Sequence, residues 1–143
     1  MPKLATFFSL TIAVAASCGT GCPPSTPGGG GTLGHQVFTI QQGVGWRRED
    51  GLGPNGPNQS LTFQPTQAGK RIDIMITTDA PQVRTSGRVY EGFTLLAAVD
   101  VPTTSTTQLS FDSQNTNVHQ LNLYFSGHGE IGSRLTVDIT QQN

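Results

Sequence analysis

The stretch RIDIMITT, residues 71–78, places an isoleucine at every second position. Its three isoleucines fall on one face of an extended chain, while Arg71, Asp73 and Thr77 fall on the other. Alternation with a period of two, with β-branched residues at the apolar positions, is typical of a strand that buries one face. The segment therefore predicts a half-buried β-strand.

The same alternation recurs on both sides of this segment. Residues 121–125 put leucine and phenylalanine on one face and direct Asn122 and Tyr124 outward. Glycine, proline and aspartate separate the alternating runs, and no run has a helical period. We therefore expect one antiparallel β-sandwich over residues 35–143, with seven to eight strands and the least defined pattern in residues 41–58. The remaining expected strands are Val37–Ile40, Leu61 with Phe63, Val83–Tyr90, an inward set of Phe93, Leu95, Ala97 and Val99, Leu109 with Phe111, and Leu135–Ile139.

The N-terminus has the parts of a secretory signal. Lys3 precedes a mainly apolar run, residues 4–16, and small residues follow it. The run is shorter than the roughly 20 apolar residues that a transmembrane helix needs. We therefore predict a signal peptide at residues 1–17 and an extracytoplasmic protein.

The segment VAASC, residues 14–18, resembles the box of bacterial lipoproteins. The resemblance implies that Cys18 becomes the new N-terminus and carries a lipid, and Gly19 behind it implies the outer membrane. The alternative is cleavage after one of residues 13–15 and a disulfide between Cys18 and Cys22 in a freely secreted protein.

Residues 18–34 have the composition of a flexible tether. PPSTPGGGG, residues 23–31, combines stiffening proline with glycine and contains no large apolar side chain. A flexible chain of this length has a typical reach of roughly 20 to 25 Å. It would hold a small domain just clear of a membrane surface.

Several motifs along residues 60–140 occur in a familiar order. They are an Ala68-Gly69 turn, Gly92-Phe93 before a strand, Leu109-Ser110-Phe111, the strand from Leu121 to Tyr124, and Gly132 before the last strand. This order resembles the bacterial pre-peptidase C-terminal domain. The resemblance implies a small jelly-roll sandwich that binds or accompanies, with no catalysis of its own.

Composition and missing motifs exclude several functions. Charged residues make up 12% of the sequence and the net charge is −1, which argues against a nucleic-acid partner. GLGPNG, residues 51–56, has the spacing of a nucleotide-binding loop but neither the strand before it nor the helix after it. No G-x-S-x-G occurs, and no cysteine follows Cys22. We predict no enzyme activity and no cofactor.

Metal ligands are also sparse. His119, His128 and Glu130 could hold zinc only if a strand and a distant turn converged, so we expect a satisfied strand-end histidine and a solvated loop histidine. Aspartates near turns occur singly, and turn formation explains each of them. We predict no metal site, with calcium bound by loop carboxylates as the alternative.

The segment Trp46-Arg47-Arg48 is the most unusual in composition and is the candidate contact for a ligand or partner. An exposed tryptophan beside guanidinium groups could stack on a sugar ring or anchor a protein. The alternative is a tryptophan that plugs one end of the sandwich, with the arginines solvated around it.

Together these features predict a lipid-anchored extracytoplasmic lipoprotein whose single domain is a non-catalytic binding or accessory module at the bacterial cell envelope. Its expected partners are the membrane, through Cys18, and an envelope protein or carbohydrate. Two alternatives remain. One is a structural subunit or assembly factor of an envelope complex, and the other is a secreted, disulfide-looped module that binds sugar or calcium.

Overall fold

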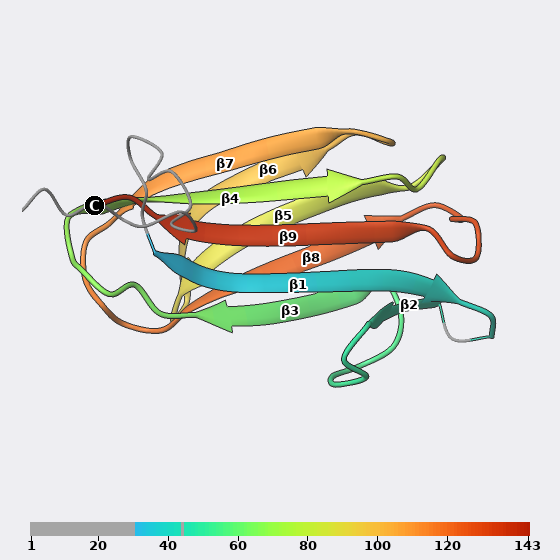
Figure 1. The fold of residues 1–143 in the computed structure, drawn as a ribbon, viewed down its shortest axis with the longest axis horizontal. Helices are drawn as coiled ribbons and strands as arrows, with labels where there is room; N and C mark the ends of the chain where they lie inside the picture. Colours follow the sequence, from blue (N-terminus) through green and yellow to red (C-terminus); the bar gives the residue numbers. More distant parts are fainter. Residues whose placement is uncertain (1–30, 44) are drawn as a thin grey trace, which may run out of the picture.

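The computed structural model describes residues 31–43 and 45–143, which form two packed antiparallel sheets (Figure 1). In these residues the nine strands confirm the predicted all-β sandwich, with one strand more than the largest number expected. No helix in the described part could span a membrane. The five-stranded sheet has the order β2 (Gly45–Arg48), β1 (Thr32–Gln41), β9 (Arg134–Gln141), β4 (Lys70–Thr78) and β7 (Thr106–Ser113); the four-stranded sheet has the order β3 (Asn58–Phe63), β8 (His119–Ser126), β5 (Arg84–Glu91) and β6 (Thr94–Val101).

The isoleucine strand lies inside the larger sheet, between β9 and β7. Ile72, Ile74 and Ile76 are each 0% exposed, as are Leu121 and Leu123 of β8 in the other sheet. Full burial of such a side chain stabilises the fold by about 1.5–3 kcal/mol. The predicted inward face of β4 is therefore part of the core between the two sheets.

The expected inward set on β6 is partly wrong. Phe93 lies before the strand and is fully exposed, and Leu95 is 51% exposed. A register shift opposite Val89 and Tyr90 inserts one residue into β6, so that Leu96 packs against the core instead. A bulge changes which residues face inward, because side chains alternate with a strict period of two.

One strand was not expected. Residues 45–48 form β2, which pairs with β1 in an antiparallel hairpin. The backbone N–H of Gly56 also donates a hydrogen bond of 2.8 Å to the carbonyl of Trp46. This short edge strand has no period-two signal, since its neighbours in sequence are glycines and charged residues.

The N-terminal boundary of the sandwich also differs from the expectation. β1 begins at Thr32, and Thr32 pairs with Thr140 of β9. Residues 32–34, expected to close the tether, therefore belong to the sheet. The predicted signal peptide and most of the predicted tether, including Cys18 and Cys22, lie outside the described residues.

The two ends of the sandwich receive different parts of the chain (Figure 1). We call the end where β1 begins and β9 finishes the entry end; it also carries residues 64–69, 92–93 and 114–118. The opposite end, called the far end, carries residues 79–83, 102–105 and 127–133. β5 runs from the far end to the entry end and connects them.

Candidate functional site

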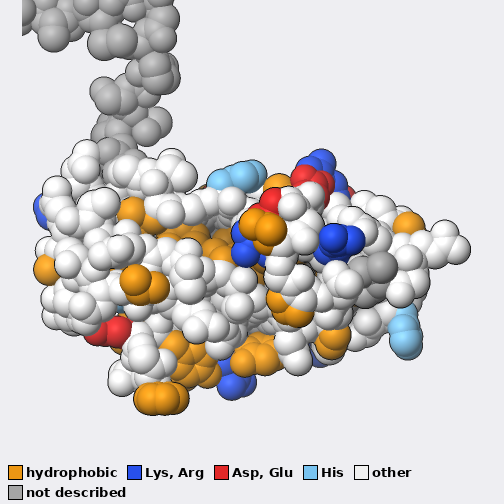
Figure 2. All heavy atoms as spheres, turned by 90° about the horizontal axis from the view of Figure 1, so that it is seen from below, with side chains coloured by type: hydrophobic (Ala, Val, Ile, Leu, Met, Phe, Trp, Pro, Cys, Tyr) orange, Lys and Arg blue, Asp and Glu red, His pale blue; other side chains and the backbone are white. Residues whose placement is uncertain are grey.

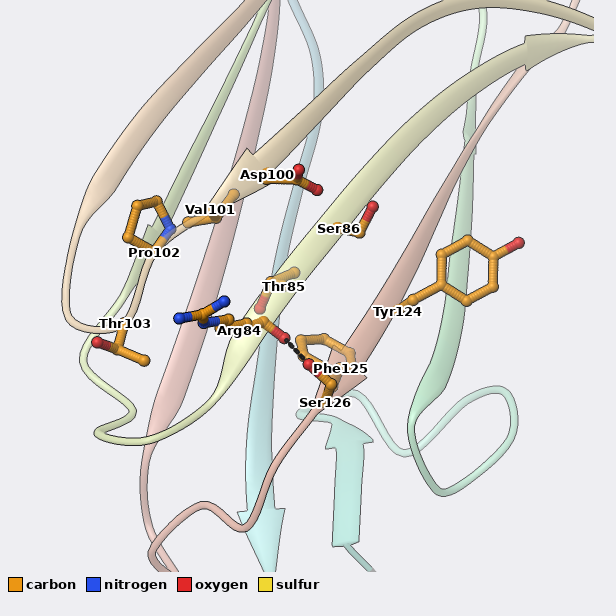
Figure 3. A pocket seen from close by; sticks show the side chains of 10 residues that line it. All are labelled: Arg84, Thr85, Ser86, Asp100, Val101, Pro102, Thr103, Tyr124, Phe125 and Ser126. Carbon is orange, nitrogen blue, oxygen red and sulfur yellow. Dashed lines mark hydrogen bonds between the residues drawn. The ribbon is translucent and has the colours of Figure 1, made fainter.

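Three polar or aromatic side chains form a row across the outer face of the four-stranded sheet. The register pairs Ser86 of β5 with Tyr124 of β8 on one side and with Asp100 of β6 on the other. Neighbouring strands lie roughly 4.7–4.9 Å apart, so the three positions are adjacent. Figure 3 shows the hydroxyl of Ser86 and the carboxylate of Asp100 on the same face, with the ring of Tyr124 beyond them.

Alternation explains why these side chains face outward. Each directly precedes or follows a buried residue of the same strand, and the buried residues are Thr85, Val101 and Phe125. The core therefore fixes the orientation of the row.

The row borders a hollow at the far end of this sheet, where β6 and β8 finish and β5 begins. The hollow has a volume of ≈ 600 Å³. Figure 3 shows Arg84 extending toward the turn that contains Pro102 and Thr103. The lining residues are Arg84, Thr85, Ser86, Asp100, Val101, Pro102, Thr103, Tyr124, Phe125 and Ser126.

Tyr124 is the exposed aromatic residue of this site, with 40% of its surface accessible. The guanidinium carbon of Arg88 lies 5.9 Å from the centre of the tyrosine ring, within cation–π range. In the register Arg88 also neighbours Asn122, one row further along the sheet. The aromatic ring is thus surrounded by groups that donate or accept hydrogen bonds.

This combination suits a polyhydroxylated ligand. An aromatic ring offers an apolar surface for the C–H face of a sugar, and its own hydroxyl both donates and accepts. The carboxylate of Asp100 accepts hydrogen bonds, the guanidinium of Arg84 donates them, and Ser86 does both. A concave site with a few polar groups around apolar surface is the usual form of a small-molecule site.

A second hollow, of ≈ 330 Å³, lies on the outer face of the five-stranded sheet. Its charged groups bind one another or nearby protein groups. Asp79 accepts a hydrogen bond of 2.6 Å from the backbone N–H of Arg134, whose side chain is 2.9 Å from Glu49. His35 at its rim is 2.5 Å from Asp138. These internal pairs leave this hollow less suited to a ligand than the first.

The sequence candidates Trp46, Arg47 and Arg48 do not line the first hollow. Trp46 is 5% exposed and stacks on Phe125, so it takes the second of its two expected roles and plugs the end of the core. Arg47 and Arg48 are partly buried, and Arg48 donates to Gln36 at 2.7 Å and to Asp50 at 2.6 Å. As contacts for a ligand or partner, the two arginines stay a prediction.

Asp50 is held ionised by the same local structure. The backbone N–H of Leu52 and the guanidinium of Arg48 lower the pKa of Asp50 below 3.8. The carboxylate therefore stabilises the turn that follows β2.

The two candidate histidines do not converge. His119 is fully buried, and its Nδ1 donates a 2.7 Å hydrogen bond to the carbonyl of Asn117. The centre of its ring lies 5.5 Å from that of Phe63 and 5.9 Å from that of Phe111. Its Nε2 has no hydrogen-bond partner among the described residues, so this strand-end histidine is only half satisfied. His128 is exposed in the loop before β9. Within residues 31–43 and 45–143 no group of three His, Cys, Asp or Glu side chains could hold a metal ion.

The sequence names Asp100 only among the loop carboxylates of the calcium alternative, and it does not bring Ser86, Asp100 and Tyr124 together as a site. The alternation directs Tyr124 outward, but the pairing of β5 with both β8 and β6 joins segments far apart in sequence. Only the register brings the three together. An outward tyrosine between inward leucine and phenylalanine was the one signal available.

Comparisons with known proteins give similarity in structure alone. No protein-family model and no curated protein matches this sequence. Among solved structures, the carbohydrate-binding module TmCBM61 in complex with β-1,4-galactotriose matches with a TM-score of 0.39 and 14% identity, covering 75% of this chain and 86% of that one. A CBM4 module matches with a TM-score of 0.40 and 16% identity, covering 76% of this chain and 72% of that one.

Proposed function

We propose that this protein is a non-catalytic binding module of the cell envelope, anchored through a lipid on Cys18, and that it binds carbohydrate on the outer face of the four-stranded sheet. The observation that carries the proposal is the row of Tyr124, Ser86 and Asp100 beside the ≈ 600 Å³ hollow. The predicted signal peptide, tether and pre-peptidase-like layout support an exported module with this role.

The neutral character of the ligand follows from the charges at the site. The hollow is lined by one cation, Arg84, and one anion, Asp100, so neither sign dominates it, and Arg88 lies beside Tyr124 outside this lining. A strongly charged ligand would face a like charge in either case. A neutral sugar can use all three as hydrogen-bond partners and stack on Tyr124.

The ligand is tested by retention on immobilised neutral polysaccharides. We expect the purified protein to be retarded on at least one of them and Tyr124→Ala to run with the void volume. Met75→Ala is the matched control, because Met75 is 44% exposed on the other sheet. Retention that is the same for all three proteins would contradict the assigned face.

The anchor is tested by the intact mass of the protein from the membrane fraction of its host, with and without an inhibitor of the lipoprotein signal peptidase. We expect a diacylglycerol-modified N-terminal Cys18 that the inhibitor abolishes. An unmodified N-terminus with a disulfide between Cys18 and Cys22 would refute anchoring and favour the secreted alternative.

A further inference from the structure

Three large apolar side chains are exposed around the entry end of the sandwich. Phe93 is fully exposed, Val118 is 56% exposed and Leu95 is 51% exposed. In Figure 2 hydrophobic side chains, drawn in orange, gather toward the lower left. Exposed apolar residues that cluster, unlike those scattered singly, indicate an interaction surface.

Two loops present these side chains, and Glu91 ties the loops together. One oxygen of Glu91 accepts a hydrogen bond of 2.7 Å from the amide of Asn115 and another of 2.7 Å from the amide of Asn117. These bonds, from Asn117 first and Asn115 second, lower the pKa of Glu91 below 4.5. Phe93 follows Glu91 by two residues and Val118 follows Asn117 directly, so the clamp holds both tips at one end of the molecule.

The predicted lipid anchor reaches the domain at this same end. β1 begins at Thr32, and Cys18 lies before it in the sequence. The candidate sugar site is remote from it: seven residue steps along β5 separate Glu91 from Arg84, roughly 23 Å at the usual rise of a strand. An anchored domain therefore has an apolar end on the side of its anchor and a polar hollow on the other.

We propose that Phe93, Leu95 and Val118 rest in the interfacial layer of the membrane that holds Cys18, so that the sandwich stands with its hollow directed away from the lipid. This inference rests on the lipid anchor of the proposed function. Transfer of aromatic and aliphatic side chains from water into the headgroup region is favourable. The tether brings them to the surface, and the contact then orients the domain.

The charges at this end favour an apolar contact over an electrostatic one. Arg71 at the start of β4 is paired with Asp73 at 2.8 Å, and the charge of Lys70 is offset by Asp112 of β7 and by Glu91. Such a balance gives no net attraction to anionic lipid. Zwitterionic vesicles are therefore the appropriate probe.

Tryptophan fluorescence in vesicles of brominated zwitterionic phosphatidylcholine tests the contact. Bromine on the acyl chains quenches the fluorescence of a tryptophan only when the indole ring contacts the lipid. The processed, lipidated protein carries Trp46, which is buried at the far end and serves as an internal reference. Phe93→Trp places a probe at the entry end, and Ile131→Trp is the matched control, because Ile131 is 66% exposed at the far end.

In Phe93→Trp we expect brominated vesicles to remove most of the emission that the tryptophan at position 93 adds to that of Trp46. The emission of the wild type and of Ile131→Trp should be retained. Equal quenching at positions 93 and 131, or none at 93 in protein with a lipid on Cys18, would overturn the inference and leave the anchor standing. If Cys18 carries no lipid, quenching of position 93 on adding vesicles would support the membrane contact and refute only the anchor. A concentration-dependent dimer abolished by Phe93→Ser, with no quenching, would assign the apolar end to a second copy instead.

Discussion

The indole of Trp46 lies flat on the ring of Phe125, with the ring centres 4.4 Å apart and the planes inclined by 15°. Phe125 also lines the candidate sugar hollow, and the residue before it, Tyr124, faces outward over the same sheet. The stacked pair thus closes the far end of the core beneath the site. Its role is structural, and in the proposed function the exposed tyrosine takes the contact role that the sequence offered to the tryptophan.

Replacing Trp46 by alanine should therefore destabilise the fold. Removal of a buried tryptophan costs about 3–5 kcal/mol of unfolding free energy, which urea unfolding followed by circular dichroism measures. Leu52→Ala, at a position that is 64% exposed, should change stability by less than about 0.5 kcal/mol. A cost for Trp46→Ala as small as that of Leu52→Ala would show that the ring does not plug the core.

The loop between β8 and β9 should tolerate alanine unequally at its two glycines with positive φ. Gly127, with φ 103°, has no room for a side chain, because a Cβ would collide with the backbone carbonyl of Gln82. Gly132, with φ 89°, would place its Cβ in open space. Both alanine variants carry backbone strain of about 1–3 kcal/mol, and the collision adds to it only at Gly127. Equal melting temperatures for the two variants would contradict the close approach of residues 82 and 127.

Stability should fall in acid because of Asp73 on the outer face of the five-stranded sheet. Partial burial raises the pKa of Asp73, but hydrogen bonds from Ser110, Arg71, Gln142 and Gln108 outweigh it and lower the pKa from 3.8 to about 2. A carboxyl whose pKa is lower in the folded state stabilises the fold above its unfolded pKa. That contribution is lost as the pH falls from about 4 toward 2.

The matched variant for this effect is Asp73→Asn. Its unfolding free energy should be lower than that of the wild type at neutral pH and should change less between pH 4 and pH 2. Urea unfolding at each pH gives both numbers. Identical pH profiles for the two proteins would mean that Asp73 does not contribute to the acid sensitivity.

The sequence predicts the fold class well because alternation is a local property. The isoleucines of residues 71–78 and the leucines of residues 121–125 are buried as expected. The orientation of residues 93–96 escapes prediction, because a bulge depends on how β6 pairs with β5. The candidate site escapes for the same reason, since its row exists only through non-local register.

Within the site, Asp100→Asn should weaken sugar binding without changing the fold. Asp100 is exposed, so the replacement leaves the core unaltered, but it removes a charged acceptor. Hydrogen bonds to charged groups contribute about 1.5–3 kcal/mol, so we expect a loss of roughly tenfold or more in affinity. Unchanged affinity would place the ligand away from β6.

The most direct test of the account is isothermal titration of an oligosaccharide, taken from the polysaccharide that retains the protein, against the wild type, Tyr124→Ala and Met75→Ala. We predict that Tyr124→Ala weakens binding by at least about tenfold, or 1.4 kcal/mol, and that Met75→Ala binds like the wild type. Binding of equal strength by all three proteins would contradict the claim that the outer face of the four-stranded sheet holds the ligand.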